Sequence, residues 1–133
     1  SDLRYEVREE AGVLAPGETL RRGAGSCRDM AALFVESCRR LGIAARFVSG
    51  YVHGPATEFG GASSHAWAEV YLPGAGWKGF DPTNESVVGP DHIPVAVHHH
   101  PEAVPPVAGS FTGARDAPVS LEVDVQIVEI PDA

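Results

Sequence analysis

The chain has 133 residues, of which 44% are hydrophobic and 21% charged, a composition typical of one globular domain with its own core. Asp and Glu number 18 against 10 Lys and Arg, so the net charge is -8. Nucleic acid and anionic membranes both require a basic face, so the charge argues against either as a partner. No apolar run approaches the length of a membrane span. Because the sequence opens with Ser1, we expect one domain over residues 1–133 that is excised from a longer polypeptide.

Two helices are predicted first. Residues 16–20 carry Pro and Glu in positions that suit the start of a short helix. A longer helix begins at Cys27 and closes at Gly42, because glycine readily forms a left-handed cap. The apolar positions of this helix follow helical spacing: Met30, Leu33, Phe34, Cys38 and Leu41.

The two cysteines of the chain both lie on this helix. The eleven residues from Cys27 to Cys38 span about 16 Å of helix axis, whereas a disulfide needs Cα atoms within roughly 7 Å. The two cysteines therefore cannot pair with each other, and Cys38 is predicted to pack in the core. Two free thiols fit a reducing compartment, so a cytoplasmic location is expected.

The rest of the chain is predicted to be mostly strands. Residues 53–64 are rich in Gly, Ser and Pro and predict a surface loop, and residues 101–118 form a long connection. The predicted strands cover residues 43–52, 65–73, 77–83, 92–100 and 120–130. The fold class that follows is α+β, with the main helix packed on an antiparallel sheet.

Three polar residues fall at the ends of predicted elements. His65 begins one strand and Asp81 ends the next, so a tight turn between these antiparallel strands makes the two residues neighbours. If Cys27 lies at the same end of the sheet, a thiol, an imidazole and a carboxylate converge as in covalent catalysis. The helix start and an imidazolium both favour the thiolate. Taken alone, Cys27 also fits a buried core thiol.

Other residues near these ends have two possible roles. Trp67 and Trp77 are candidates for the wall of a substrate cleft, and packing in the core stays open for both. Asp29 lies in the first turn of the helix and is expected to cap it, and Arg28 either braces the helix start or lies on the surface.

A run of three histidines ends the strand predicted at residues 92–100. Alternation sends His98 and His100 to one face and His99 to the other. A zinc site needs at least one more ligand, and the sequence has no pair of ligands with finger or H-E-x-x-H spacing. We therefore expect a solvated strand end, no metal and no cofactor.

Three sequence blocks resemble the core of bacterial transglutaminase-like proteins, which have a papain-like Cys-His-Asp arrangement. The blocks are YEVREEAGVLAPGETLRRGAGSCRD, GSCRDMAALFVESCRRLGIAARFVSGY and SHAWAEVYLPGAGWKGFDPTN, and the resemblance runs from about residue 5 to about residue 97. It implies a transglutaminase-like core that follows a β-rich domain. It also implies Cys27 as the nucleophile, His65 as the general base and acid, and Asp81 as the orienting carboxylate.

The same resemblance bears on two further residues. Tyr5 is a candidate second oxyanion donor, because the family places polar or aromatic groups upstream of the cysteine. The first donor is expected from the helix start itself, as the backbone N–H of Cys27. His92 resembles the histidine of an HI block in the family, and its role stays open between a structural one and support of the site.

The function that follows is a cysteine-dependent amide hydrolase or acyl transferase that forms a thioester on Cys27. Its expected partner is a protein or peptide amide, with hydrolysis favoured because the sequence has no evident site for a second substrate. The alternative is a binding module that keeps the fold with little or no catalytic activity. A homodimer through a surface that a missing neighbour would cover also stays open.

Overall fold

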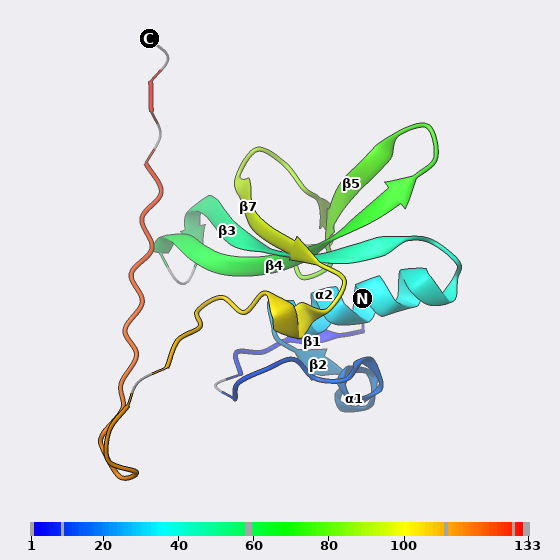
Figure 1. The fold of residues 1–133 in the computed structure, drawn as a ribbon. Coiled ribbons are helices and arrows are strands. Elements are labelled where there is room, and N and C mark those ends of the chain that lie inside the picture. The colour runs from blue at the N-terminus through cyan, green and yellow to red at the C-terminus, as the bar shows by residue number, and fades with distance from the viewer. Residues whose placement is uncertain (1, 9, 58–59, 111, 129, 132–133) are drawn as a thin grey trace.

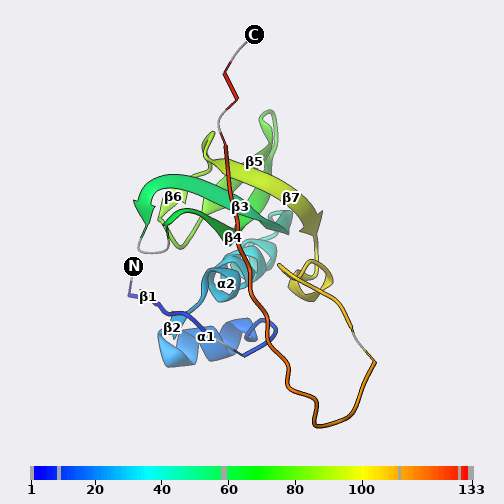
Figure 2. The same cartoon turned by 90° about the vertical axis from the view of Figure 1, so that its left-hand side faces the viewer.

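The computed structural model describes residues 2–8, 10–57, 60–110, 112–128 and 130–131, and Figure 1 shows its fold. The helices are α1 (Pro16–Arg22), α2 (Cys27–Arg40) and a 3-10 turn η1 (Pro101–Ala103). The strands are β1 (Arg4–Tyr5), β2 (Ala24–Gly25), β3 (Ala45–Thr57), β4 (Gly60–Leu72), β5 (Gly76–Asp81), β6 (Ser86–Val87) and β7 (His92–His98). Helix α2 lies between the large sheet and the layer formed by α1, β1 and β2 (Figures 1 and 2).

Helix α2 begins and ends where the sequence predicts. Ser26 is its N-cap, and a capping box joins the Ser26 and Asp29 side chains to each other's backbone N–H groups. Gly42 follows the helix with a φ of 78°, the left-handed conformation expected at this position. Cys38 packs beside the buried cluster on the apolar face, as predicted, and both cysteines are free.

The large sheet is antiparallel, in the order β6-β5-β4-β3-β7. One face packs on α2, because the inward residues of β3 and β4 alternate with a period of two and meet the apolar stripe of the helix. The core that results has two clusters, centred on Val35 with Ala68 and on Ala31 with Phe47. The predicted class, an α+β core with the main helix on an antiparallel sheet, is confirmed.

The prediction of a surface loop at residues 53–64 is wrong. β3 continues to Thr57 and β4 begins at Gly60, with His53 paired to Ala62 and an irregular register beyond that pair. Glycine, serine and proline are less frequent in strands than in loops, which is why this segment looks like a loop in the sequence. The pairing of β3 with β4 in a long hairpin outweighs that preference. Residues 58 and 59 lie outside the described residues.

The prediction of a strand at residues 120–130 is also wrong for the described part of that segment. Residues 120–128 and 130 run as extended chain that is not part of a strand, beside the compact part of the molecule (Figure 1). Leu121 and Ile130 are 71% and 85% exposed. An alternating pattern determines which side chains share a face, but it supplies no neighbouring strand, and a strand needs one.

Candidate active site

Cys27 is the first residue of α2, where the main-chain N–H groups have no carbonyl partner inside the helix. The helix start is anchored by Asp29, whose side chain is fully buried. Its carboxylate accepts from Arg8 Nε at 2.6 Å, from Leu14 N–H at 2.8 Å and from Ser26 N–H at 2.9 Å. Burial raises the pKa of Asp29, but these hydrogen bonds outweigh it and hold that pKa below its usual value. Asp29 therefore caps the helix, as predicted, and also ties it to the N-terminal segment.

His65 and Asp81 are neighbours, as the predicted hairpin requires. Strands β4 and β5 pair in the register Ala68 to Phe80, which brings the first part of β4 beside the end of β5. His65 Nε2 lies 2.8 Å from Asp81 Oδ2. Since Nε2 faces the carboxylate, Nδ1 is the ring nitrogen left for Cys27, which contributes to the raised pKa of the His65 ring. The structure thus brings thiol, imidazole and carboxylate together.

The charge state of His65 follows from these two neighbours. Burial by itself lowers the pKa of the imidazole, but the hydrogen bond and charge of Asp81, with the neighbouring Cys27, outweigh burial. Together they raise the pKa of His65 from 6.5 to about 9. At neutral pH the ring is therefore an imidazolium beside the sulfur of Cys27, an arrangement that favours the thiolate.

Asp81 is held by more partners than His65 alone. Its Oδ1 accepts the backbone N–H groups of Thr83 and Asn84 at 3.1 and 3.3 Å, and its Oδ2 accepts the Asn84 amide at 2.8 Å. Burial raises the pKa of Asp81, but the hydrogen bond and charge of His65, with the bonds from His92 and Asn84, hold it far below its usual range. Asp81 is therefore an ionised acceptor.

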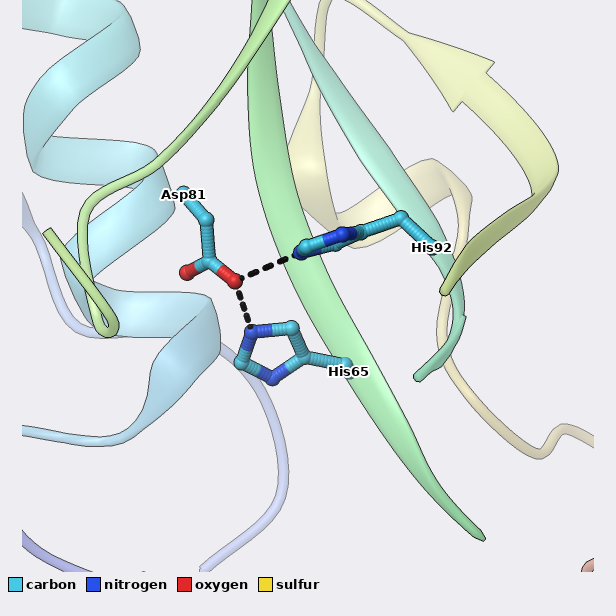
Figure 3. Close-up of side chains that lie close together, drawn as sticks. All are labelled: His65, Asp81 and His92. Carbon is cyan, nitrogen blue, oxygen red and sulfur yellow. Dashed lines mark hydrogen bonds and ion pairs between the residues drawn. The ribbon is translucent and has the colours of Figure 1, made fainter. Parts of the chain in front are cut away.

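His92 is a fourth member of the site whose role the sequence left open. Its Nε2 lies 2.9 Å from the same Oδ2 atom, so His65 and His92 point at one oxygen from different strands (Figure 3). Its ring also packs edge-on against Trp67, with centroids 5.0 Å apart. The one sequence signal for His92 was its position in an HI pair at the start of a predicted strand.

A cleft of about 560 Å³ opens at Cys27. Other residues on its wall are Tyr5, Arg28, Tyr51, Ser64 and Glu102. Tyr5 is 49% exposed, and burial, with the neighbouring Cys27, raises the pKa of its phenol, so its hydroxyl stays a protonated donor on the cleft wall. A second hollow between α1 and α2, lined by Leu20 and Leu33, is mainly apolar and lies apart from these groups.

Residues 1–82, which include Cys27, His65 and Asp81, match the sequence model of the Transglutaminase-like superfamily. The chain belongs to this superfamily. The resemblance of its sequence blocks to transglutaminase-like proteins is thereby confirmed. His92 lies outside the matched residues.

Relatives of this transglutaminase-like chain occur in mycobacteria. It is 34% identical over 135 residues to the uncharacterized protein Rv2569c of Mycobacterium tuberculosis, a match that covers 94% of this chain and 43% of that protein. It is 34% identical over 119 residues to the uncharacterized protein ML0607 of Mycobacterium leprae, covering 84% of this chain and 42% of that protein. The chain thus spans less than half the length of these relatives.

Two solved structures resemble the transglutaminase-like fold of this chain. A candidate cysteine protease from Cytophaga hutchinsonii superposes with a TM-score of 0.60 at 30% identity, over 74% of this chain and 32% of that one. The periplasmic domain of TgpA from Pseudomonas aeruginosa, solved with bound ethylmercury, superposes with a TM-score of 0.51 at 26% identity, over 64% of this chain and 34% of that one. Among the described residues, no helix has the length and apolar character to cross a membrane.

The two tryptophans do not line the cleft of this transglutaminase-like domain, which corrects their candidacy as cleft walls. Trp67 is 1% exposed and packs behind the site against His92. Trp77 pairs with Tyr71 near the turn of the β4–β5 hairpin, and Arg46 stacks over its ring at 4.1 Å. It lies at the opposite end of β5 from Asp81 because the strand separates the two residues. Being close in sequence did not place either ring in the cleft.

The histidine run and Arg28 can also be placed. β7 ends at His98, so the predicted alternation over His99 and His100 is wrong, and the three rings pack on one another instead. Arg28 braces the helix start, because its guanidinium donates to the carbonyls of Pro101 and Val104 at 2.8 and 3.0 Å. His99 and His100 are exposed, so the run is a solvated strand end as predicted, and Arg28 anchors the helix start.

One group of side chains in the described part of the transglutaminase-like chain has the spacing of a metal site. Its ligand atoms, on His65, Asp81 and His92, lie within 4.8 Å of one another. Each of these atoms already takes part in a hydrogen bond of 2.8 or 2.9 Å centred on Oδ2. We interpret the group as a hydrogen-bonded cluster.

Proposed function

We propose that this domain cleaves amide bonds of proteins or peptides through a thioester on Cys27, with His65 as general base and acid and Asp81 as the orienting carboxylate. The observation that carries the proposal is the position of the His65 ring. Its Nε2 bonds Asp81, which leaves Nδ1 for Cys27 at the open cleft. An imidazolium oriented by an ionised carboxylate beside a thiol at a helix start is the arrangement that nucleophilic catalysis by cysteine needs.

The reaction proceeds in two halves. The Cys27 thiolate attacks the carbonyl carbon of the amide, and a C–S bond forms. The tetrahedral intermediate collapses when the C–N bond breaks, and the departing amine takes the proton from His65 Nδ1. A water molecule then gives a proton to His65 while its oxygen bonds the carbonyl carbon of the thioester. The C–S bond breaks, which releases the carboxylic acid and restores the Cys27 thiolate and the His65 imidazolium.

The negative oxygen of the tetrahedral intermediate needs hydrogen-bond donors. The backbone N–H of Cys27, in the first turn of α2, is the first donor in this proposal. The Tyr5 hydroxyl is the second donor. Its place on the cleft wall supports this role, as does the raised pKa of Tyr5, to which Cys27 contributes.

Water resolves the thioester in our proposal, since it reaches an open cleft without a second binding site. A primary amine such as a lysine would resolve the same thioester in a transamidation, in which the C–S bond is exchanged for a new C–N bond. The cytoplasmic location expected from the free thiols stays a prediction.

A screen of labelled peptide amides, with and without an amine acceptor, tests the proposed function. Release of free acid by the wild-type domain, its loss in Cys27→Ala and its retention in Cys38→Ala would support hydrolysis at Cys27. Incorporation of the amine would instead assign a transferase. If neither this domain nor a longer protein containing it turns over any donor, the binding module is the better description.

A rapid reaction of Cys27 with iodoacetamide at near-neutral pH checks the thiolate without any substrate. Labelling should disappear in Cys27→Ala and persist in Cys38→Ala, because Cys38 packs beside the core and burial raises the pKa of its thiol. Fast labelling that persists in Cys27→Ala would contradict the proposal.

A further inference from the structure

His92 is a buried ring with a hydrogen-bond partner at each nitrogen. Its side chain is 10% exposed at the start of β7, and Trp67 packs against it. Among the described residues, the titratable side chains in contact with this ring are Asp81, through a hydrogen bond, and His65, through its ring. Such a ring is fixed in position, so the two atoms it bonds determine where its proton lies.

The hydrogen bonds of His92 select one tautomer. The backbone N–H of Gly89 donates to Nδ1 at 3.3 Å, so Nδ1 carries a lone pair and no proton. Asp81 is ionised and can only accept, so the proton must be on Nε2, which lies 2.9 Å from Oδ2. Two such partners are both satisfied only by the neutral Nε2–H imidazole.

The donor at Nδ1 belongs to a turn that is itself anchored. His92 N–H donates to Gly89 O at 3.1 Å, so Gly89 and His92 bond each other in both directions. His53 N–H donates to Asp91 O at 2.9 Å and fastens this turn to β3. The ring therefore has a fixed position relative to the sheet that carries His65.

At Oδ2 the His92 proton meets two other donors. His65 and His92 bond this oxygen at 2.8 and 2.9 Å (Figure 3). The Asn84 amide also donates to it at 2.8 Å. With Oδ1 bound to two backbone N–H groups, the carboxylate has no freedom to rotate. Its orientation in turn fixes the His65 ring, whose other nitrogen faces Cys27.

We propose that His92 is a positioning residue of this site, a neutral imidazole held between the Gly89 N–H and Asp81 Oδ2 so that the carboxylate orients His65 toward Cys27. The inference rests on the proposed function, because it assigns His92 to the support of the same three groups. It adds a residue outside the segment that matches the family.

The tautomer is measured directly in the folded domain by long-range proton–nitrogen NMR of histidine-labelled protein. His92 should show the Nε2–H pattern that its two hydrogen bonds select. Gly89→Pro removes the N–H and should give a mixture of tautomers. Gly89→Ala keeps the N–H, and its Cβ meets no atom within 4 Å, so it should resemble the wild type. A cationic or Nδ1–H ring in the wild type would overturn the proposal.

The positioning role is measured by the rate of Cys27 alkylation. His92→Leu removes the donor and should slow alkylation about tenfold, the effect of one lost hydrogen bond to a charged group. His92→Gln keeps an N–H for Asp81 and an oxygen for Gly89, so its rate should stay within about threefold of wild type. His99→Leu is the control, since His99 is exposed.

Equal rates for the leucine and glutamine variants would overturn the role. If the leucine variant does not fold, the Gly89→Pro and Gly89→Ala pair decides through the same alkylation rate, with only the proline variant expected to be slow. Absence of amide turnover in every variant would remove the proposed function and leave the tautomer and alkylation results to judge His92 independently.

Discussion

His65 and His92 approach one oxygen of Asp81 from strands β4 and β7, with Nε2 to Oδ2 distances of 2.8 and 2.9 Å. Strands β4 and β7 are not neighbours in the sheet, since β3 lies between them. The carboxylate on β5 thus joins three strands through one atom. Because it is ionised and fixed, it holds the imidazolium of His65 at a defined place beside Cys27.

The stability of the fold should depend on the charge of His65. Its pKa is about 9 in the folded state against 6.5 ordinarily, so its stabilising effect is complete below about pH 6.5 and is lost as pH rises through about 9. The unfolding free energy should fall by up to about 3 kcal/mol over this window. Urea unfolding at several pH values measures it, with His65→Gln expected to be flatter. An equal slope in both proteins would refute the assignment.

Gly50 lies opposite His65 in the β3–β4 register and beside a register shift between β3 and β7. A Cβ at Gly50 would overlap the carbonyl oxygen of Ile93 and lie 2.7 Å from the Trp67 ring. Gly50→Ala should therefore lower the unfolding free energy by about 1–3 kcal/mol, the range for overpacking, and displace β7 with His92. Urea unfolding measures the loss.

Gly17→Ala is the matched control for Gly50→Ala. Gly17 lies in α1, and a methyl group added there would meet no atom within 4 Å, so alanine should be neutral or stabilise by up to about 1 kcal/mol. Equal effects at the two glycines would mean that the close approach of β7 does not matter.

Arg8 neutralises the buried Asp29, and their side chains are 7% and 0% exposed. Arg8→Ala leaves that carboxylate buried without its cation and should cost about 3–5 kcal/mol of unfolding free energy. Arg22→Ala breaks an exposed pair with Glu6 and should cost less than about 1 kcal/mol. Chemical denaturation of both variants checks the contrast, and similar losses would contradict it.

Tyr5 and Tyr51 line the same cleft, and only Tyr5 is proposed to contact the oxyanion. Tyr5→Phe should reduce kcat by about a hundredfold with little change in KM, because the interaction forms only in the transition state. Tyr51→Phe should leave kcat within about threefold. Steady-state kinetics on the amide found in the screen give both values, and an unchanged kcat in Tyr5→Phe would rule out this donor.

Much of the site could be predicted because its parts are local. The helix that begins at Cys27 follows from Ser26, the apolar spacing and Gly42, and the hairpin from its alternating pattern and tight turn. Two antiparallel strands joined by a short turn have only one way to place His65 beside Asp81.

The errors came where a local pattern depended on a distant partner. The loop predicted at residues 53–64 and the strand predicted at residues 120–130 both rest on composition or alternation alone. Pairing along a long hairpin turned the first into strand, and lack of a paired neighbour left the second as extended chain. Trp67, which the sequence left open between the cleft wall and the core, shares a face of β4 with His65 because the two are two residues apart. It is buried there against His92 and does not line the cleft.

By itself the sequence determined the main helix, the hairpin of β4 and β5, the α+β class and the meeting of His65 with Asp81, because periodicity, caps and tight turns act within a few residues. Only the tertiary structure decided that His92 bonds the same carboxylate, which ring nitrogen of His65 faces the sulfur, and which side chains line the cleft. These outcomes depend on how β7 and the N-terminal segment pack against the hairpin and α2. Contacts between segments far apart in the chain leave no periodic pattern along it.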